Sequence, residues 1–361
     1  MKIGFYGSSL LSAYWNGAAT YYRGLIRALS LRGHAVTFFE PDAFGRQAHA
    51  DMGPPDWCRV EIYDASAEGL SRVVGEAQAF DVVVKASGVG IFDEELPPAL
   101  LAARRPGALF VFWDVDAPAT LATLEREGDH PMHGWLGACD MVLTYGGGAG
   151  VVARYETLGA RACHPVYNAL DPHTHYPVSP VPRYKADLGF LGNRLPDREA
   201  RVDAFPFEAA RLRPERTFLL GGAGWEGCAL PPNLTAIGYV RTSDHNAFNA
   251  STRAVLNISR QSMAEAGYAP ATRVFEAAGA GACLITDDWP GIDAFLAPGT
   301  EILVARDGRE VAELLDGLTP ARAAAIGAAA RRRIRRDHTY ERRAERVEAL
   351  LAPALAKREA A

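Results

Sequence analysis

Short apolar runs alternate with longer segments of helical periodicity along the whole chain. In the first half the apolar runs are rich in β-branched and aromatic residues and are apolar on both faces, as buried parallel strands are. They span 2–7, 34–40, 81–87, 108–114 and 140–145. Between the first two runs, Tyr22, Leu25 and Leu29 recur at helical spacing and Gly33 is placed to end the helix. This half is therefore predicted to be a parallel βαβ domain.

A proline-rich passage without periodicity, residues 168–187, interrupts this alternation. Prolines cannot sustain a helix or a central strand there. The alternation then resumes, with apolar runs at 188–192, 216–222, 234–239, 254–259, 282–287 and 301–305, before a helical tail rich in Ala, Arg and Glu. We predict an α/β chain of two Rossmann-like domains facing each other across a cleft. The expected division is 1–170, a linker at 171–187, 188–337, and a last helical segment at 338–361.

Length, composition and net charge indicate which class of protein this chain belongs to. The chain has 361 residues, 48 % hydrophobic and 22 % charged, which is typical of a globular protein of two domains. Its net charge of −5 argues against nucleic acid or an anionic membrane as the main partner, because both require a basic field. The arginine-rich run 331–336 is a local exception, either a solvated helix face or a contact for a phosphate or an anionic partner.

The cysteines and the start of the chain indicate the compartment. Five cysteines are scattered without a CxxC pair, which favours a reducing compartment over a disulfide framework or a zinc site. The first residues do not form a signal peptide, and no stretch approaches the roughly 18 apolar residues of a membrane span. We therefore expect a cytoplasmic protein without a transmembrane segment.

The most informative stretch is "ATRVFEAAGAGACLITDDWPG", residues 271–291. Thr272 and Arg273 stand where a helix is predicted to begin, and the free N–H groups and positive potential of a helix N-terminus suit a phosphate. An arginine adds a bidentate donor. Glu276, one turn later, can accept two hydrogen bonds from a vicinal diol such as a ribose. The alternative is structural: Thr272 caps the helix and Glu276 completes a capping pair.

Other strand ends carry further candidates for binding such a ligand. Arg260 follows one strand, and Asn193 and Arg194 follow another, in positions that fit phosphate, although Arg194 is equally placed to be a solvated loop residue. Tyr239 and Val240 end a third strand, where their backbone groups can meet the edge of a nucleobase.

The first half offers a glycine and an acidic pair. Gly17 precedes a helix and permits close approach of a ligand to the backbone, although no GxGxxG fingerprint is present. Asp114 and Asp116 form a D-x-D pair that can hold a divalent ion. Alternatively, Asp116 binds an acceptor hydroxyl or caps a helix starting at Pro118.

Two histidines are spaced as metal ligands in the proline-rich passage. His173 and His175 are either a metal pair or exposed linker histidines. Because no further ligands accompany them or the acidic pair in the sequence, we predict no metal site.

Several blocks resemble the GT-B-fold glycosyltransferases, in particular the spore-maturation-protein type with a glycosyltransferase-family-1-like C-terminal domain. They are "LGFLGNRLPDRE", "TRVFEAAGAGACLITDDWPGIDAFLAPGTEILVARD", "HTYERRAERVEALL", "NGAATYYRGLIRAL" and "FWDVDAP". The resemblance implies that the second domain binds a nucleotide sugar, with Glu276 on the ribose, Thr272 and Arg273 on the diphosphate, and Arg194 and Arg260 as further cations. It also implies that the first domain binds the acceptor and that the last helix packs on it. One departure is Glu265, eleven residues before Glu276 where many relatives have a glutamate eight residues before.

The expected function is therefore transfer of a sugar from a nucleoside-diphosphate sugar to an acceptor hydroxyl, without a metal or cofactor. Resemblance to the retaining branch implies that the diphosphate helps to take the acceptor proton, and Arg273 stabilises the departing diphosphate. An inverting route would need a side-chain base, for which Asp116 is the candidate. Two alternatives remain: a sugar-nucleotide epimerase of the same architecture, which needs carboxylates and histidines converging on the sugar, and a binding protein without turnover.

Overall fold

The computed structural model describes residues 1–14 and 16–359, and the chain divides into two compact units. The first comprises Met1–Tyr167 together with the segment from Tyr340 onward, and the second is Asn168–Thr339. The segment 171–187, predicted as a linker, lies within the second unit: the Val181 N–H donates to Ser251 Oγ at 2.8 Å, and Tyr184 is buried. The segment has little regular structure before a short 3-10 helix at Pro182–Tyr184 and the start of β8, yet it packs on the unit.

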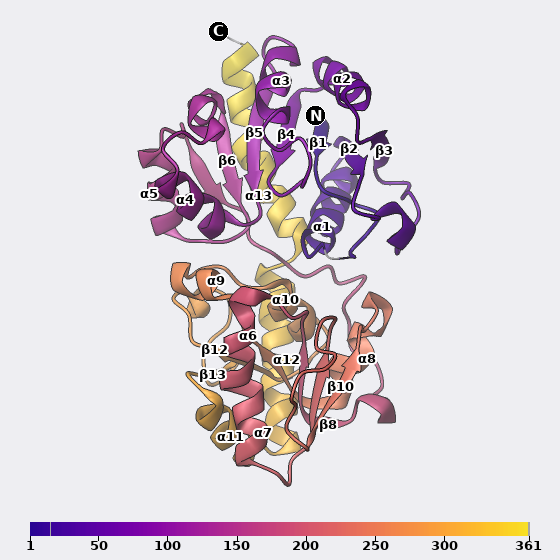
Figure 1. The fold of residues 1–361 in the computed structure, drawn as a ribbon, viewed down its shortest axis with the longest axis vertical. Helices are drawn as coiled ribbons and strands as arrows, with labels where there is room; N and C mark the ends of the chain where they lie inside the picture. Colours follow the sequence, from indigo (N-terminus) through magenta and orange to yellow (C-terminus); the bar gives the residue numbers. More distant parts are fainter. Residues whose placement is uncertain (15, 360–361) are drawn as a thin grey trace. The chain divides into compact units, whose positions relative to one another are not determined.

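Seven parallel strands form the sheet of the first unit, in the order β3-β2-β1-β4-β5-β6-β7 (Figure 1). Five of them match the predicted runs. The sequence prediction missed β3 and β7 because β3 is an edge strand with mostly exposed or half-buried side chains, and β7 has only three residues. The strands are β1 (Lys2–Tyr6), β2 (Ala35–Asp42), β3 (Arg59–Asp64), β4 (Val82–Ala86), β5 (Leu109–Asp114), β6 (Met141–Thr144) and β7 (Cys163–Pro165).

Helices cover this sheet: α1 (Ala18–Leu31), α2 (Ala67–Gly75), α3 (Leu96–Ala103), α4 (Ala117–Arg126), α5 (Ala149–Thr157) and α13 (Tyr340–Glu359). The last of these is separated from the rest of the unit by the whole second unit in sequence, yet packs against α1 and β5 (Figure 1). Charged contacts fix its orientation: Glu348 accepts hydrogen bonds from Arg32 and lies 2.7 Å from His34 Nε2.

The contact between α1 and α13 depends on Gly24. A Cβ at this position would lie 2.1 Å from the ring of Tyr340, so any larger residue must displace the aromatic side chain. Gly24→Ala is expected to lower the free energy of unfolding by about 1–3 kcal/mol, as overpacking does in well-packed cores. Thermal and urea unfolding measure this. In the matched control, Gly75→Ala at the end of α2, nothing lies within 4 Å of the added Cβ, and stability should not fall.

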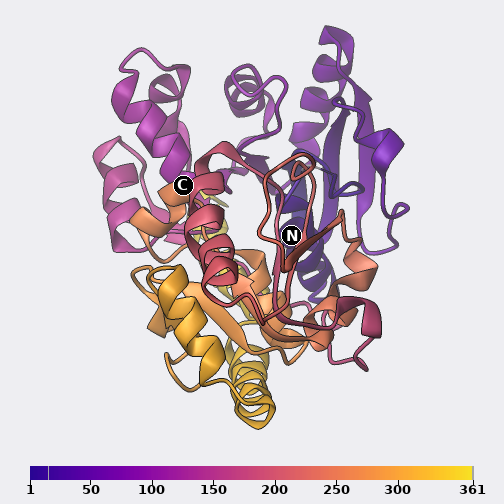
Figure 2. The same ribbon diagram turned by 60° about the horizontal axis from the view of Figure 1, so that its bottom comes forward.

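The second unit has six parallel strands in the order β10-β9-β8-β11-β12-β13, and all six match predicted runs. Figure 2 shows this unit, in pink to yellow tones, from a second direction. The strands are β8 (Ala186–Leu191), β9 (Phe218–Gly221), β10 (Leu234–Gly238), β11 (Thr252–Asn257), β12 (Leu284–Asp287) and β13 (Leu303–Ala305). The helices are α6 (Pro196–Val202), α7 (Glu208–Leu212), α8 (His245–Ser251), α9 (Gln261–Ala266), α10 (Thr272–Gly279), α11 (Gly308–Asp316) and α12 (Pro320–Asp337).

The predicted α/β class with two Rossmann-like units is confirmed. The five cysteines are free. The arginine run 331–336 lies on α12 around the buried Ile334, and two of its members, Arg333 and Arg336, pair with Asp337. Within the described part of the chain, no helix combines the length and the apolar character that a membrane crossing requires.

Candidate functional site

The carboxyl ends of three neighbouring strands in the second unit carry polar residues. Asn257 ends β11, Asp287 ends β12, and Asn193 stands two residues after the end of β8. Strands β8, β11 and β12 are adjacent and parallel, so these ends meet at one edge of the sheet. Ligands of open parallel sheets bind at this edge.

A buried hydrogen-bond network connects these strand ends. Asn257 Nδ2 donates to Thr286 Oγ1 at 3.0 Å, and Thr286 Oγ1 donates to Asp287 Oδ1 at 3.1 Å. Asp287 also accepts from Ser259 N at 3.1 Å and from Arg201 Nη2 at 2.6 Å. Burial raises the pKa of Asp287, and Arg201 opposes this shift. With its amide nitrogen held in this way, Asn257 presents its Oδ1 as a fixed acceptor.

That acceptor orients Arg273 in the first turn of α10. Arg273 Nη1 donates to Asn257 Oδ1 at 2.8 Å, and its guanidinium lies 5.0 Å from the centroid of the Phe190 ring. Arg198, from α6, lies 5.7 Å from the same centroid and donates to the Asn193 carbonyl. Phe190 thus has two half-buried guanidinium groups around its ring.

These two arginines are incompletely neutralised. Burial lowers the pKa of Arg273 to about 9, and the nearby Arg198 acts in the same direction. Burial also lowers the pKa of Arg198 to about 10. Among the described residues, no carboxylate forms a salt bridge with either guanidinium. Two desolvated cations without a paired carboxylate stabilise an anion that binds between them.

The arginines chosen from the sequence are engaged differently. Arg194 is salt-bridged to Glu199, and Arg260 Nε lies 2.6 Å from Asp197 Oδ2. The sequence analysis missed Arg198, although it stands in the same quoted motif four residues after Arg194. Glu199, one residue further along, decides which of the two arginines is neutralised.

Helix α10 begins at Thr272, and its N-cap residue is Ala271, which makes no side-chain cap bond. The alternative in which Thr272 caps the helix and Glu276 completes a capping pair is therefore wrong. The N-terminal N–H groups of α10 stay free of side-chain caps and can meet an anion. The Glu276 carboxylate, half-buried one turn later, has no hydrogen-bond or salt-bridge partner within the described ranges.

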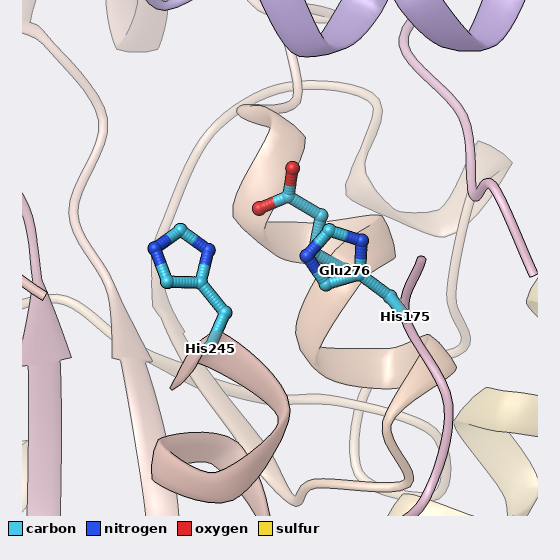
Figure 3. Close-up of side chains that lie close together, drawn as sticks. All are labelled: His175, His245 and Glu276. Atoms are coloured by element: carbon cyan, nitrogen blue, oxygen red, sulfur yellow. The ribbon is translucent and has the colours of Figure 1, made fainter. Parts of the chain in front are cut away.

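Two histidines lie beside Glu276. His175, His245 and Glu276 each offer one ligand atom, and these atoms all lie within 4.8 Å of one another (Figure 3). His175 is only 4 % exposed, so the interpretation of both histidines as exposed linker residues is wrong for His175, while His173 is exposed. Burial lowers the pKa of His245, and the nearby Glu276 opposes this shift.

The remaining predicted residues of the second unit differ in their exposure and in their hydrogen-bond partners. Asn193 Oδ1 accepts from Ala223 N at 3.0 Å, so this side chain ties two loops together. Tyr239 is 56 % exposed, whereas Val240 is buried. Glu265 is exposed on α9 and accepts from Gln261 Nε2 at 2.5 Å.

Gly17 and Asp116 belong to the first unit. Gly17 is the exposed N-cap of α1, and an added Cβ would meet nothing within 4 Å. Asp116 is the N-cap residue of α4, which begins at Ala117 and not at Pro118, and its side chain makes no cap bond. Asp114 is buried and accepts from Ser87 Oγ at 2.7 Å and from the Tyr155 hydroxyl. Asp114 and Asp116 do not form a three-ligand metal cluster in the described residues.

Residues 198–349 match the family described as glycosyl transferase-like. Several solved structures share the fold of nearly the whole chain. Sucrose-phosphate synthase from Thermosynechococcus elongatus is 14 % identical with a TM-score of 0.72, and the match covers 99 % of this chain and 100 % of that one. HepE from Anabaena, in complex with UDP and glucose, is 14 % identical with a TM-score of 0.66, over 98 % of this chain and 100 % of that one. An alpha-glucosyltransferase in complex with UDP and DNA is 12 % identical with a TM-score of 0.72, over 98 % and 99 %.

No curated protein sequence matches the chain. The identities to the solved structures are low, so these matches establish the fold, whereas the family match runs from within α6 to the first half of α13. Both agree with the predicted enzyme class. The chain therefore carries a glycosyl transferase-like domain at residues 198–349 within the GT-B fold of glycosyltransferases.

Proposed function

We propose that this glycosyltransferase moves a sugar from a uridine-diphosphate sugar to an acceptor hydroxyl. The observation that carries the proposal is the pair of half-buried arginines, Arg198 and Arg273, at the carboxyl end of the sheet beside the N-terminus of α10. A nucleoside diphosphate supplies the anion that this pair lacks. Several neighbouring structures contain UDP or UDP-glucose, which supports uracil as the base of the donor nucleotide.

Each part of the donor then has a partner in the second unit. The diphosphate binds Arg198, Arg273 and the first N–H groups of α10, and the Thr272 hydroxyl adds a further contact. The ribose diol donates to the unpartnered carboxylate of Glu276. The nucleobase meets the backbone at Val240, which lies between β10 and α8, the helix that begins at His245.

The reaction relies on placement and charge. As the bond to the sugar breaks, negative charge grows on the departing diphosphate, and fixed guanidinium groups and helix amides stabilise it without reorganising. In this proposal no metal ion takes part in catalysis and no cofactor is needed. We favour retention of configuration, with a diphosphate oxygen accepting the proton of the attacking hydroxyl. The spore-maturation type suggested by the sequence stays a prediction, as does a main acceptor other than nucleic acid.

An inverting enzyme would instead use Asp116 as a base. Turnover of Asp116→Asn separates the two routes, because loss of a general base lowers the rate by about 100- to 10,000-fold. Near-normal turnover is the result expected for the retaining route. The stereochemistry of the product, read by NMR, provides an independent assignment.

Donor binding can be tested through Glu276. Replacing Glu276 by alanine is expected to weaken UDP binding by about 10- to 100-fold, since hydrogen bonds to a charged acceptor contribute about 1.5–3 kcal/mol. Calorimetric titration with UDP and with 2′-deoxy-UDP measures it. If Glu276 holds the ribose diol, the wild type should prefer UDP and the variant should lose that preference.

Glu265→Ala is the matched control, since Glu265 is exposed and bonded to Gln261. UDP binding equal to wild type is expected there. The assignment of Glu276 to the ribose is wrong if Glu276→Ala binds UDP normally or keeps the preference for the 2′-hydroxyl. Thermal-shift measurements with UDP, GDP, dTDP, ADP and CDP test the choice of base, because the ligand that binds the folded state raises its unfolding temperature.

The cluster of His175, His245 and Glu276 also bears on the epimerase alternative, which needs histidines and carboxylates on the sugar. In our assignment this cluster lies at the nucleoside end of the donor, with Glu276 occupied by the ribose. Incubation with UDP-sugars and no acceptor distinguishes the functions: an epimerised nucleotide sugar seen by NMR would replace our proposal. Binding without conversion under any acceptor condition would indicate a protein that lacks turnover.

A further inference from the structure

We propose that His175, His245 and Glu276 form a binding site for a divalent transition-metal cation, with Zn²⁺ as the best match. Their ligand atoms lie within 4.8 Å of one another. Three ligands around zinc lie about 2.0–2.2 Å from the metal, so inward shifts of under about 1 Å per atom complete the site. Figure 3 shows a ring nitrogen of each histidine turned toward the space that the carboxylate also faces. Two histidines and one glutamate are a ligand set that zinc uses.

The proton arrangement on His175 leaves its inner nitrogen available to a metal. The Thr174 hydroxyl donates to the Asp171 carbonyl at 3.2 Å, and its oxygen lies 2.9 Å from His175 Nδ1. With its own proton directed to Asp171, this hydroxyl accepts from His175 Nδ1–H. The lone pair then resides on Nε2, which is buried and has no hydrogen-bond partner. A neutral imidazole with its outer N–H bonded and its inner nitrogen free is the form that binds metals.

The backbone around both histidines is fixed by one side chain. Asn246 Nδ2 donates to the Thr174 carbonyl at 2.8 Å, and Asn246 Oδ1 accepts from Tyr176 N at 3.2 Å. Asn246 therefore brackets His175 on both sides, and it follows His245 directly in the first turn of α8. The side-chain amide of Asn246 thus holds together two histidines that lie seventy positions apart in sequence.

Helix α10 brings the third ligand close because it carries a glycine. A Cβ at Gly279 would lie 2.3 Å from Leu170 and 3.2 Å from the carbonyl oxygen of His175. Only glycine lets this helix approach the 170–175 segment so closely, with Glu276 three residues earlier in the same helix. Within the described residues, this is the one group of three such side chains within ligand distance.

The site has a functional consequence that rests on the proposed function. Glu276 cannot hold a ribose diol and a metal ion in the same place, so zinc and the nucleotide should exclude each other. Zinc would then inhibit the enzyme by competition with the donor.

Titration of the metal-free protein with Zn²⁺ in the absence of nucleotide, against a chromophoric chelator, tests the site. We expect one zinc ion per chain, with little competition from Mg²⁺, which prefers oxygen ligands. His175→Ala, His245→Ala and Glu276→Gln should each weaken zinc binding by about 100-fold or more. Thr174→Val should weaken it by about tenfold, because outer partners of metal-bound histidines contribute 10- to 100-fold in affinity.

His173→Ala is the matched control, because His173 is two residues from His175 but exposed. Unchanged zinc affinity is expected for it. Equal affinity in wild type, His175→Ala and His245→Ala would overturn the proposal, as would an equal loss in His173→Ala. Should the buried His175 variant fail to fold, the half-buried His245 and Glu276 variants decide, with circular dichroism as the check on folding.

The zinc site and the UDP-sugar donor site can be refuted independently of each other. Zinc binding that depends on both histidines in a protein that ignores UDP would leave the metal site standing and remove the donor assignment. UDP binding in a protein whose zinc binding does not depend on the histidines would support the donor assignment and remove the metal site. If both hold, saturating UDP should raise the apparent dissociation constant for zinc, and 2′-deoxy-UDP should do so less.

Discussion

Replacing Arg273 by alanine should lower kcat/KM for sugar transfer by about 100- to 1000-fold, the loss seen when one preorganised donor to a developing charge is removed. Arg273 is held by Asn257 at 2.8 Å and packed on Phe190, so its guanidinium reaches the diphosphate already oriented. Steady-state kinetics with a UDP-sugar measure the effect. Arg273→Lys keeps the charge but loses the planar two-point contact, and it should recover only part of the rate.

Arg194→Ala is the matched control for Arg273→Ala. Arg194 was equally eligible in the sequence, but it is half-exposed and paired with Glu199. An exposed ion pair contributes about 0–1 kcal/mol, so kcat/KM should change by only a few-fold. A large loss in Arg194→Ala together with near-normal kinetics in Arg273→Ala would reverse our assignment of the diphosphate site.

The contrast between Arg194 and Arg198 shows what the sequence can and cannot predict. Both arginines stand in one motif after β8, and the motif indicates the segment where we propose that an anion binds. Which arginine is available depends on the turn at the start of α6, where Arg194 meets Glu199 and Arg198 packs on Phe190. The sequence pattern identifies the segment that carries the two arginines. The ion pair between Arg194 and Glu199, which only the structure shows, leaves Arg198 as the arginine available to an anion.

The strands illustrate the same limit at the level of the fold. An interior strand such as β5 is apolar on both faces over most of its length, so the sequence alone predicts it. The edge strand β3 mixes exposed and half-buried positions and lacks such a run. Helix α13 is readable as a helix, but its packing on α1 depends on a glycine at position 24 that only the structure connects to Tyr340.

The cluster around Glu276 was beyond sequence reasoning for a different reason. His175 was considered only with its neighbour His173, because the sequence shows ligand spacing along the chain and not across it. His245 lies seventy residues further along the chain, at the start of α8, and Asn246 holds it beside His175. The prediction of no metal site rested on local spacing alone, and our zinc proposal departs from it on the basis of this long-range contact.

The buried Asp287 is expected to be the most costly carboxylate of the second unit to remove. It is fully buried and accepts from Arg201, Ser259 and Thr286, so its loss leaves a half-buried guanidinium and several donors without their partner. Breaking a buried ion pair from one side costs about 3–5 kcal/mol. We therefore expect Asp287→Ala to lower the free energy of unfolding by about that amount in urea titrations.

Asp316 offers a control with the same ion-pair distance but a different environment. The Arg213–Asp316 and Arg201–Asp287 pairs both measure 2.6 Å, yet the Asp316 side chain is 43 % exposed and the Asp287 side chain 0 %. Asp316→Ala should therefore cost only about 0–1 kcal/mol. If both variants lost the same free energy of unfolding, burial would not be the reason for the contribution of the Asp287 network to stability. Because that network fixes Asn257, and Asn257 orients Arg273, Asp287→Ala should also weaken UDP binding at temperatures where the variant is still folded, whereas Asp316→Ala should not.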